Sequence, residues 1–274
     1  MSRPLFSCVV PVKGPRPYFD EAVASLLNQG LGDELEIIVQ DGTTEHTEYT
    51  EKVDVGDGKV KWFREADCGQ SDALNKGFAK ANGEWLFWLN ADDVLLPGAL
   101  MKVKDFVDRV KHVEWIAGNT IYVDKSGKVI GTRCDAKWRP WFGKSMSVWT
   151  GGPSAFFRRG LWEKHGGFDT SLKFVMDLDL WTRWAQTGVR FKSIDEYLWG
   201  FRIHEGSATY KISNRRAIER EFQDVLRRFN IHNEHFWRNV TRMASVFDGT
   251  RWRRIRDTIR FRGKGLADCV GIPK

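Results

Sequence analysis

The sequence predicts a doubly wound α/β fold, in which helices cover both faces of a mostly parallel central sheet, followed by a helical C-terminal extension. Four short apolar runs rich in β-branched and aromatic residues have the length of strands, at 6–12, 34–40, 59–65 and 84–90. Segments with helical spacing alternate with them, around 17–29, 45–54 and 71–82. Near-continuous apolar strands linked through helices are typical of a parallel sheet buried on both faces.

The regular alternation stops beyond residue 110. The segment "HVEWIAGNTIYVDKSGKVIGTR" indicates two strands joined at Ser126 and Gly127. The remaining elements are a strand at 153–159, helices near 158–165 and 176–187, a last strand at 197–204, and mostly helical spacing over 211–262. Between them lies an aromatic loop that contains Trp138, Trp141, Phe142 and Trp149.

Charge divides the chain near residue 210. Residues 1–210 carry 27 Lys and Arg against 29 Asp and Glu, whereas residues 211–274 carry 16 against 7. We expect a domain over 1–210, with a nucleotide-binding half at about 1–110 and an acceptor half at about 111–210, and a basic helical extension over 211–274. The excess of positive charge in the extension suggests that it faces an anionic surface, either phospholipid or nucleic acid.

Composition narrows the class of protein. With 274 residues, 42% of them hydrophobic, the chain can bury a real core. The four cysteines are scattered without a C-x-x-C pair, which argues against structural zinc and against a disulfide framework. The first apolar run ends at Lys13, too early for a signal peptide, and no window approaches the ~18 apolar residues of a spanning helix. We expect a protein of the cytoplasmic side.

Polar residues follow each of the four early strands. The segments are "KGPRP", "QDGTTEHT", "EADCGQSDALNKG" and "NADD". Each could be an ordinary turn or a helix cap. In a doubly wound sheet, however, ligands bind at the carboxyl ends of the strands, where these four segments would converge.

Two adjacent carboxylates, Asp92 and Asp93, end the fourth apolar run. Like charges at a buried strand end repel each other unless a cation or hydrogen-bond donors compensate them. A divalent cation does so, and carboxylate oxygens suit Mg²⁺ or Mn²⁺. The alternative is that the pair caps a helix that begins near Pro97.

Five segments together resemble the family 2 glycosyltransferases with the GT-A fold. They are "VVPVKG", "EIIVQDGTTEHT", "CGQSDALNKGFAKANGEWLFWLNADDVLLPGAL", "GGFDTSLKFVMDLDLWTRWA" and "FRIHEGSAT", in the family's order, over roughly residues 5–209. The resemblance implies an inverting enzyme of the hexosyl- or deoxyhexosyltransferase class. The spanning helices and Q-x-x-R-W motif of the family's processive synthases are missing, so transfer of one residue at a time is favoured.

The resemblance also assigns a donor site. It implies that Asp93 and His204 bind the metal, Mn²⁺ or Mg²⁺, and that Asp92 lies nearer the ribose or a metal-bound water. The other residues expected to bind the nucleotide sugar are Pro11, Lys13, Asp41, Asp72, Asn75 and Lys76. A carboxylate at Asp41 could accept a hydrogen bond from uracil N3, which favours UDP or dTDP. Asn90 stands where many relatives have Asp.

Asp177 is the expected general base. On a helix it heads an apolar stripe with Leu180, Trp181 and Trp184, and a carboxylate beside indoles tends to have a raised pKa. In the family this position supplies the base, although Glu is usual where this chain has Met176. Otherwise Asp177 would simply be a first-turn charge on a helix.

These features predict a metal-dependent inverting transferase that moves one sugar from a nucleotide-diphosphate donor to a hydroxyl of a glycan, in surface polysaccharide biosynthesis. A lipid-linked acceptor would explain the basic amphipathic segment 251–264, which could lie on the inner face of the plasma membrane; packing of its apolar face on the body is the alternative. No nucleic acid partner is expected. The competing interpretation is an inactive sugar-nucleotide-binding or partner subunit.

Overall fold

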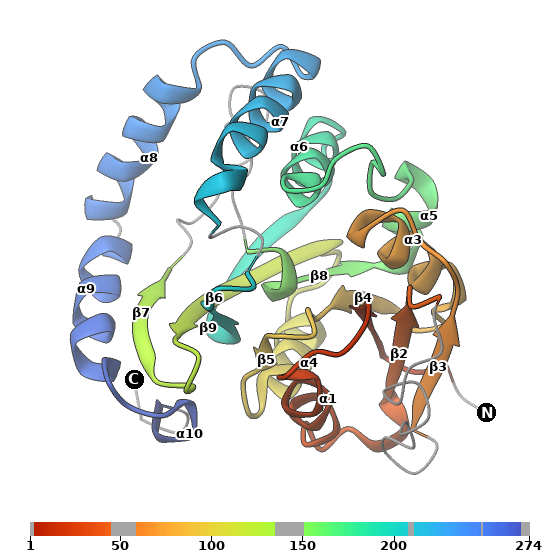
Figure 1. Cartoon of the computed structure of the whole chain (residues 1–274). Coiled ribbons are helices and arrows are strands. Elements are labelled where there is room, and N and C mark those ends of the chain that lie inside the picture. The colour runs from red at the N-terminus through yellow and green to blue at the C-terminus, as the bar shows by residue number, and fades with distance from the viewer. Residues whose placement is uncertain (1–2, 45–58, 135–150, 208–210, 248, 270–274) are drawn as a thin grey trace.

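The computed structural model describes residues 3–44, 59–134, 151–207, 211–247 and 249–269. Within them, a curled nine-stranded sheet is flanked by helices on both faces, and the C-terminal helices run along one side (Figure 1). This arrangement confirms the predicted α/β fold class. The predicted helix at 45–54 and the aromatic loop with Trp138, Trp141, Phe142 and Trp149 lie outside the described residues.

The first half of the sheet is parallel, as the alternating pattern predicts. Its strands, in spatial order, are β3 (Val60–Arg64), β2 (Leu35–Asp41), β1 (Phe6–Val12) and β4 (Trp85–Trp88). All three pairings among them are parallel. The helices α1 (Phe19–Leu27) and α3 (Gln70–Lys80) follow β1 and β3. The carboxyl ends of these strands therefore meet at one edge.

The second half of the sheet is mixed. It contains β5 (Val94–Leu95), β6 (Trp115–Val123), β7 (Val129–Arg133), β8 (Ala155–Arg158) and β9 (Phe191–Arg202). Only β6 and β9 pair in parallel here; β8 is antiparallel to both β4 and β6. The hairpin of β6 and β7 turns at Gly127, whose φ of 81° suits glycine. The predicted last strand at 197–204 is longer than expected.

Two apolar layers fix the helices against the sheet. On one face the helices are α1 and α4 (Ala99–Arg109), and on the other they are α3, α5 (Arg159–His165) and α6 (Met176–Gln186). Trp115 stacks on Trp181 with ring centroids 4.9 Å apart. A Cβ on Gly77 would clash with the side chain of Val9, so α3 lies very close to β1. This close packing positions the first turn of α3 beside the strand ends.

The C-terminal extension is helical. Its helices are α7 (Arg215–Arg228), α8 (Glu234–Phe247), α9 (Thr250–Phe261) and α10 (Leu266–Cys269). The Glu221 carboxylate of α7 accepts hydrogen bonds from backbone N–H groups at the entry to α6, including that of Phe174 at 2.8 Å. α9 packs on β7 through Thr132 and Thr258, whose hydroxyls lie 2.9 Å apart. In the described part of the chain, no helix is long and apolar enough to cross a membrane.

Candidate active site

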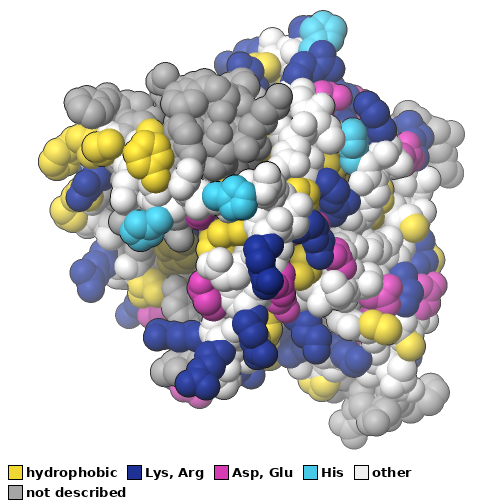
Figure 2. All heavy atoms as spheres, turned by 90° about the horizontal axis from the view of Figure 1, so that it is seen from above, with side chains coloured by type: hydrophobic (Ala, Val, Ile, Leu, Met, Phe, Trp, Pro, Cys, Tyr) yellow, Lys and Arg dark blue, Asp and Glu magenta, His cyan; other side chains and the backbone are white. Residues whose placement is uncertain are grey.

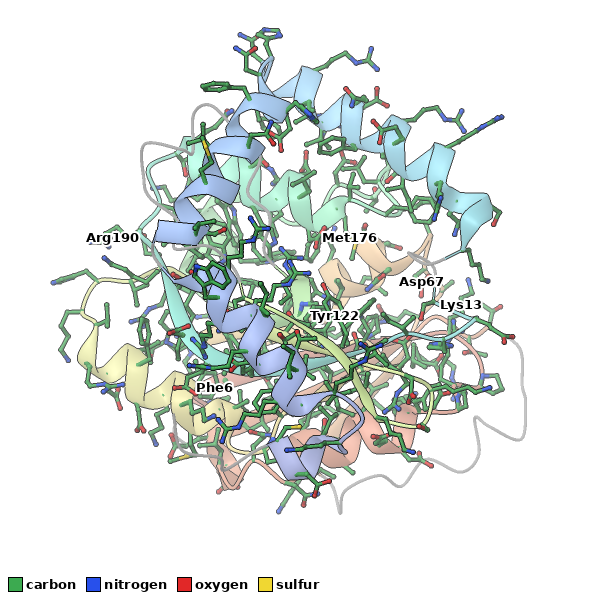
Figure 3. The ribbon with its side chains drawn as sticks, turned by 90° about the vertical axis from the view of Figure 1, so that its left-hand side faces the viewer. Phe6, Lys13, Asp67, Tyr122, Met176 and Arg190 are labelled. Carbon is green, nitrogen blue, oxygen red and sulfur yellow. The ribbon has the colours of Figure 1, made fainter. Side chains whose placement is uncertain are left out.

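A pocket of about 530 Å³ opens where the strands end. Its walls come from four places in the sequence: the end of β1 with the approach to α1, the loop before α3, the end of β4, and the segment after β9. The lining residues are Pro11, Val12, Lys13, Arg16, Pro17, Tyr18, Asp67, Gly69, Gln70, Ala73, Asn90, Ala91, Asp92, Phe201, His204, Gly206 and Ser207. Figure 3 shows Lys13 and Asp67 on the same side of the molecule. Three of the four predicted polar strand ends thus line one pocket, whereas the segment after β2 contributes none of the described lining residues.

Asp92 and His204 meet at this pocket from segments far apart in the sequence. His204 Nε2 lies 2.9 Å from Asp92 Oδ2, and both side chains are partly exposed, 17% for His204 and 31% for Asp92. The Tyr18 ring packs edge-on against the imidazole, with centroids 5.2 Å apart. An accessible carboxylate and an accessible imidazole therefore face the same volume.

Asp93, by contrast, is fully buried. Its Oδ1 accepts a hydrogen bond from the Arg202 N–H at 2.9 Å, and its Oδ2 accepts one from Asn90 Nδ2 at 2.8 Å. Burial, followed by the charge of Asp92, raises the pKa of Asp93 well above its usual range. The carboxylate expected to bind metal is therefore turned into the protein, and Asp92 has the exposed position instead.

Arg202 holds this strand end in place. The side chain is 1% exposed, and it donates from Nε to the Asp92 carbonyl at 3.0 Å and from an Nη to Glu21 Oε2 at 2.6 Å. Its guanidinium also lies over the Tyr18 ring, 4.4 Å from the centroid. One buried cation thus connects α1, β9 and the loop that carries Asp92.

The predicted residues of α3 support the pocket without lining it. Lys76 Nζ bonds both the Asp72 carboxylate and the Ala66 carbonyl at 2.7 Å. The hydrogen bond from Lys76 is the main cause of the lowered pKa of the Asp72 carboxyl. The Asn75 amide exchanges two hydrogen bonds with the backbone of Phe168, both 2.9 Å long. All three residues hold the loops that flank the site.

Asp67 and Gln70, rather than the predicted residues of α3, line the pocket. The Asp67 Oδ1 accepts a hydrogen bond from Gly69 N at 3.0 Å, and its Oδ2 lies against Gly42, just after β2. Gln70 donates to Asn90 Oδ1 at 2.7 Å. Within the segment "EADCGQSDALNKG" the resemblance implies a role for Asp72, whereas Asp67 lines the pocket; spacing alone does not indicate which carboxylate lies over the strand ends.

Asp41 has little carboxylate surface left to offer a base. It is fully buried at the end of β2, and its Oδ1 accepts a hydrogen bond from Thr43 N at 2.8 Å. Its Oδ2 lies 3.3 Å from Arg64 Nε. The described pocket does not include Asp41. Its contact with a nucleotide base stays a prediction, and its hydrogen bonds indicate a role in shaping the loop after β2.

Pro11 and Lys13 line the pocket, together with Arg16 and Tyr18 from the approach to α1, and their contact with a nucleotide sugar stays a prediction. Lys13 and Arg16 both belong to the polar strand end "KGPRP", of which only Lys13 is a predicted ligand. Two cationic side chains at the pocket provide charge that suits the phosphates of a nucleotide. Arg202 was missed because nothing local marks an arginine on a strand as buried.

Asp177 lies in the first turn of α6. Its Oδ1 accepts the Leu178 N–H at 2.8 Å, and a Cβ on Gly152 would come within 3.3 Å of Oδ2. Among the described residues no hydrogen bond to Oδ2 is found. Burial raises the pKa of Asp177 to about 6, against the opposing charge of Arg133. A carboxylate with this pKa can accept a proton near neutral pH.

The start of α6 adjoins the wall of the pocket. The Ser71 hydroxyl donates to the Leu172 carbonyl at 2.9 Å and lies 2.9 Å from Met176 Sδ. Ser71 directly follows Gln70, which lines the pocket. Asp177, next to Met176, is therefore close to this wall, while Asp177 itself does not line the described cavity.

The described residues hold no group of three or more His, Cys, Asp or Glu side chains able to bind a metal. Asp92 and His204 offer two ligands, one oxygen and one nitrogen, on an accessible wall. Such a pair fits Mn²⁺ or Mg²⁺ when substrate phosphates and water complete the shell, because these ions are often held by few protein ligands. The residues therefore fit the predicted cofactor, and the metal contacts expected of Asp93 and His204 stay predictions.

Comparison with known proteins identifies the family. The model of the family described as Glycosyl transferase family 2 matches residues 7–160, which is more than half of the chain. An uncharacterized glycosyltransferase of Rickettsia typhi is 28% identical over 215 residues, 75% of this chain and 66% of that protein. Another, from Nostoc sp., is 28% identical over 205 residues, 68% of this chain and 61% of that protein. The chain belongs to glycosyl transferase family 2, and it spans less than two thirds of the length of these two relatives.

Solved structures share the fold. S. aureus TarS 1–349 in complex with UDP-GlcNAc aligns with a TM-score of 0.63 at 19% identity, covering 82% of this chain and 65% of TarS 1–349. The mannosyltransferase PcManGT from Pyrobaculum calidifontis, in complex with GDP-Man and Mn²⁺, aligns with a TM-score of 0.55 at 21% identity, covering 75% of this chain and 59% of that one. At these identities the likeness concerns the GT-A fold.

Proposed function

We propose that the protein is a metal-dependent, inverting glycosyltransferase that moves one sugar from a nucleotide-diphosphate donor to a hydroxyl of a glycan acceptor. The observation that carries this proposal is the pairing of Asp92 with His204, 2.9 Å apart, at a pocket of about 530 Å³ where the strands end. A pocket of this volume is in the range of small-molecule and cofactor sites.

The donor's diphosphate is the group this pocket suits best. Lys13 and Arg16 line one wall, and Asp92 with His204 lines another. We assign Asp92 and His204 as the residues that hold Mn²⁺ or Mg²⁺, with Asp93 buried behind them as support. The bound ion would supply positive charge next to the phosphates. The cationic side chains of this chain add to that charge as the nucleoside diphosphate departs.

Asp177 is assigned as the general base. Its Oδ2 takes the proton of the acceptor hydroxyl while the hydroxyl oxygen forms a bond to the anomeric carbon. The bond from that carbon to the phosphate oxygen breaks, and the nucleoside diphosphate leaves with the electron pair. No second carboxylate is assigned as a nucleophile, so a single displacement with inversion is the expected course, by analogy with two-carboxylate glycosidases.

The two departures from the family pattern have a structural reason, and this favours an active enzyme over an inactive binding subunit. Asn90 donates to the buried carboxylate of Asp93 at 2.8 Å, which an ionised aspartate could not do. Met176 is 6% exposed and packs in the core beside Ser71. Neither substitution removes a group from the Asp92, His204 and Asp177 arrangement.

The nucleotide base of the donor and the class of the acceptor are further parts of this proposal. UDP and dTDP are favoured by the sequence resemblance alone, since Asp41 is already engaged with Thr43 and Arg64. Asp67, which lines the pocket beyond β2 and β3, is the carboxylate we propose near the nucleoside. A glycan of surface polysaccharide biosynthesis, carried on a lipid, is the proposed acceptor.

Calorimetric titration of UDP, dTDP and GDP, with and without Mn²⁺, tests the donor site. We expect one nucleotide to bind, and Mn²⁺ to tighten it. Asp92→Asn should remove most of the tightening by Mn²⁺, because a charged ligand of the ion is lost. Asp93→Asn is the matched control, since it changes the neighbouring carboxylate while leaving Asp92 and His204 at the pocket.

The two variants distinguish Asp92 from Asp93 as the ligand of the metal ion. If Asp93→Asn abolished Mn²⁺-dependent binding in a folded protein while Asp92→Asn left it intact, the assignment of the ligands would be reversed. If no nucleotide bound under any condition, the proposed donor site would be wrong.

A further inference from the structure

Helix α9 has two different faces. Asp257 and Phe261 are buried against the body, and Tyr197 Oη donates to Asp257 Oδ2 at 2.9 Å. Trp252, Ile255 and Ile259 point the other way and are 63%, 43% and 74% exposed. Their spacing places the three on one stripe of the helix. The apolar stripe of the segment 251–264 therefore does not pack on the body of the described protein.

Basic side chains border this stripe on both sides. Helical spacing places Arg256 and Arg260 along one flank and Arg251 along the other, and all three are exposed. On α8, Phe236 and Met243 are 61% and 58% exposed. Figure 2 shows hydrophobic side chains beside lysine and arginine at the left edge of the molecule, the side on which Figure 1 places α8 and α9.

We propose that the outer face of α9, continued by α8, docks on an anionic phospholipid surface. Exposed Trp and Ile side chains suit the boundary between headgroups and acyl chains, and flanking arginines can reach lipid phosphates from that depth. The segment 251–264 has seven basic residues against one acidic residue, and of these Arg251, Arg256 and Arg260 border the exposed stripe, where they match an anionic leaflet. A nucleic acid would use the arginines but would leave the apolar stripe in water.

The docking face is firmly attached to the catalytic sheet. Arg254 Nε donates to the Thr132 carbonyl at 3.1 Å, and the Thr258 hydroxyl lies 2.9 Å from that of Thr132. The next residue on β7, Arg133, is close enough for its charge to lower the pKa of Asp177. A membrane held by α9 would thus be connected through one short strand to the acceptor side of the site.

Flotation of the full chain with vesicles tests the docking face. We expect binding to vesicles of phosphatidylcholine with phosphatidylglycerol, and little binding to phosphatidylcholine alone. Trp252→Ser combined with Ile259→Ser should lower the partition coefficient at least roughly tenfold, since both apolar side chains leave the interface. Arg251→Gln and Arg256→Gln should each lower it roughly fivefold.

Matched controls lie on α4, where Met101 is 41% exposed and Arg109 is also exposed. Met101→Ser and Arg109→Gln should leave vesicle binding unchanged. Circular dichroism and nucleotide binding verify that each variant is folded. Because vesicle binding needs no turnover, its outcome is independent of the proposed reaction.

Two results would overturn the proposal. If vesicle binding survived the loss of the Trp252 and Ile259 side chains, the binding would be due to basic charge alone, and the apolar stripe would not be a docking face. Sedimentation velocity that reveals a dimer, converted to a monomer by Trp252→Ser with Ile259→Ser and indifferent to vesicles, would assign the face to a contact between two copies of this chain.

Discussion

The end of β4 and the start of α6 each carry two nearby aspartates, and in both regions the two carboxylates have opposite environments. At β4, Asp92 faces the pocket and Asp93 is fully buried under the backbone of Arg202. At α6, Asp177 keeps an oxygen without a described hydrogen bond, whereas Asp179 is 1% exposed and bonded to Arg183 at 2.9 Å and to Arg228 at 2.7 Å. One carboxylate of each pair keeps an accessible or unbonded oxygen, and its neighbour is buried and bonded to a group from a distant segment.

The comparison also separates two ways of stabilising a buried carboxylate. Asp93 receives N–H donors from a peptide and an amide, and its pKa is raised by burial. Asp179 instead receives two guanidinium groups, from its own helix and from α7. The N–H donors lower the pKa of Asp93, but burial and the neighbouring charge of Asp92 outweigh them. We therefore expect substitutions at the four positions to separate activity from stability.

The largest effect is expected at Asp177. Asp177→Asn should preserve nucleotide binding and lower transfer roughly 10²- to 10⁴-fold, because the amide cannot accept the proton. Transfer can be followed as release of nucleoside diphosphate from the donor that calorimetry identifies. In the native enzyme the rate should rise with pH through about 6, the pKa of this carboxyl. Near-normal turnover of the variant would exclude Asp177 as the base.

A smaller effect, on stability, is expected at Asp179. Asp179→Asn leaves Arg183 and Arg228 without their shared carboxylate, and we expect the free energy of unfolding to fall by about 2 to 4 kcal/mol. Urea denaturation measures it. Asp224→Asn is the control, because Asp224 pairs with Arg227 on the surface of α7 and should cost at most about 1 kcal/mol. Equal losses in the two variants would contradict the anchoring role of Asp179.

The smallest effect concerns the pH dependence of stability at Asp177. Its folded pKa of about 6 lies above the usual 3.8, so the folded state binds this proton more tightly than the unfolded state. The stabilisation that the protonated Asp177 carboxyl gives to the folded state is therefore fully present below about pH 4, and it is lost as pH rises to about 6. At pH 8 Asp177→Asn should be more stable than the native protein by about 1 to 2 kcal/mol.

Urea denaturation at pH 4.5, 6 and 8 measures this difference between the two proteins. A difference that stays constant over this range would mean that the ionisation of Asp177 does not oppose folding.

Local pattern was enough to predict most elements and the edge at which the site forms. Strand runs, helical spacing and polar strand ends depend on neighbours in the chain, and the structure has them close to the expected positions. Two elements differ from the prediction: the two-residue strand β5, Val94–Leu95, was not predicted, and β9 begins six residues before the expected Tyr197. Short strands and polar strand starts carry little periodicity.

Side-chain direction within the site could not be predicted from the same patterns. Adjacent residues point to different sides of an element, so the sequence indicates that Asp92 differs from Asp93 without indicating which one faces the ligand. Asp72, Asn75 and Lys76 share one side of α3, yet their contacts run to the loops at Ala66 and Phe168. The contacts of this helix face can therefore be assigned only when the positions of those loops in the fold are known.

The amino-acid order alone thus determined the alternation of strands and helices, the charged extension and the set of carboxylates available at one edge of the sheet. Tertiary structure decided which of them reach the pocket. The reason is physical: the donor that turns Asp93 inward comes from Arg202, 109 residues later, and a cation that holds Asp179 comes from Arg228, 49 residues later. Burial and hydrogen bonding depend on such distant partners, which no local pattern records.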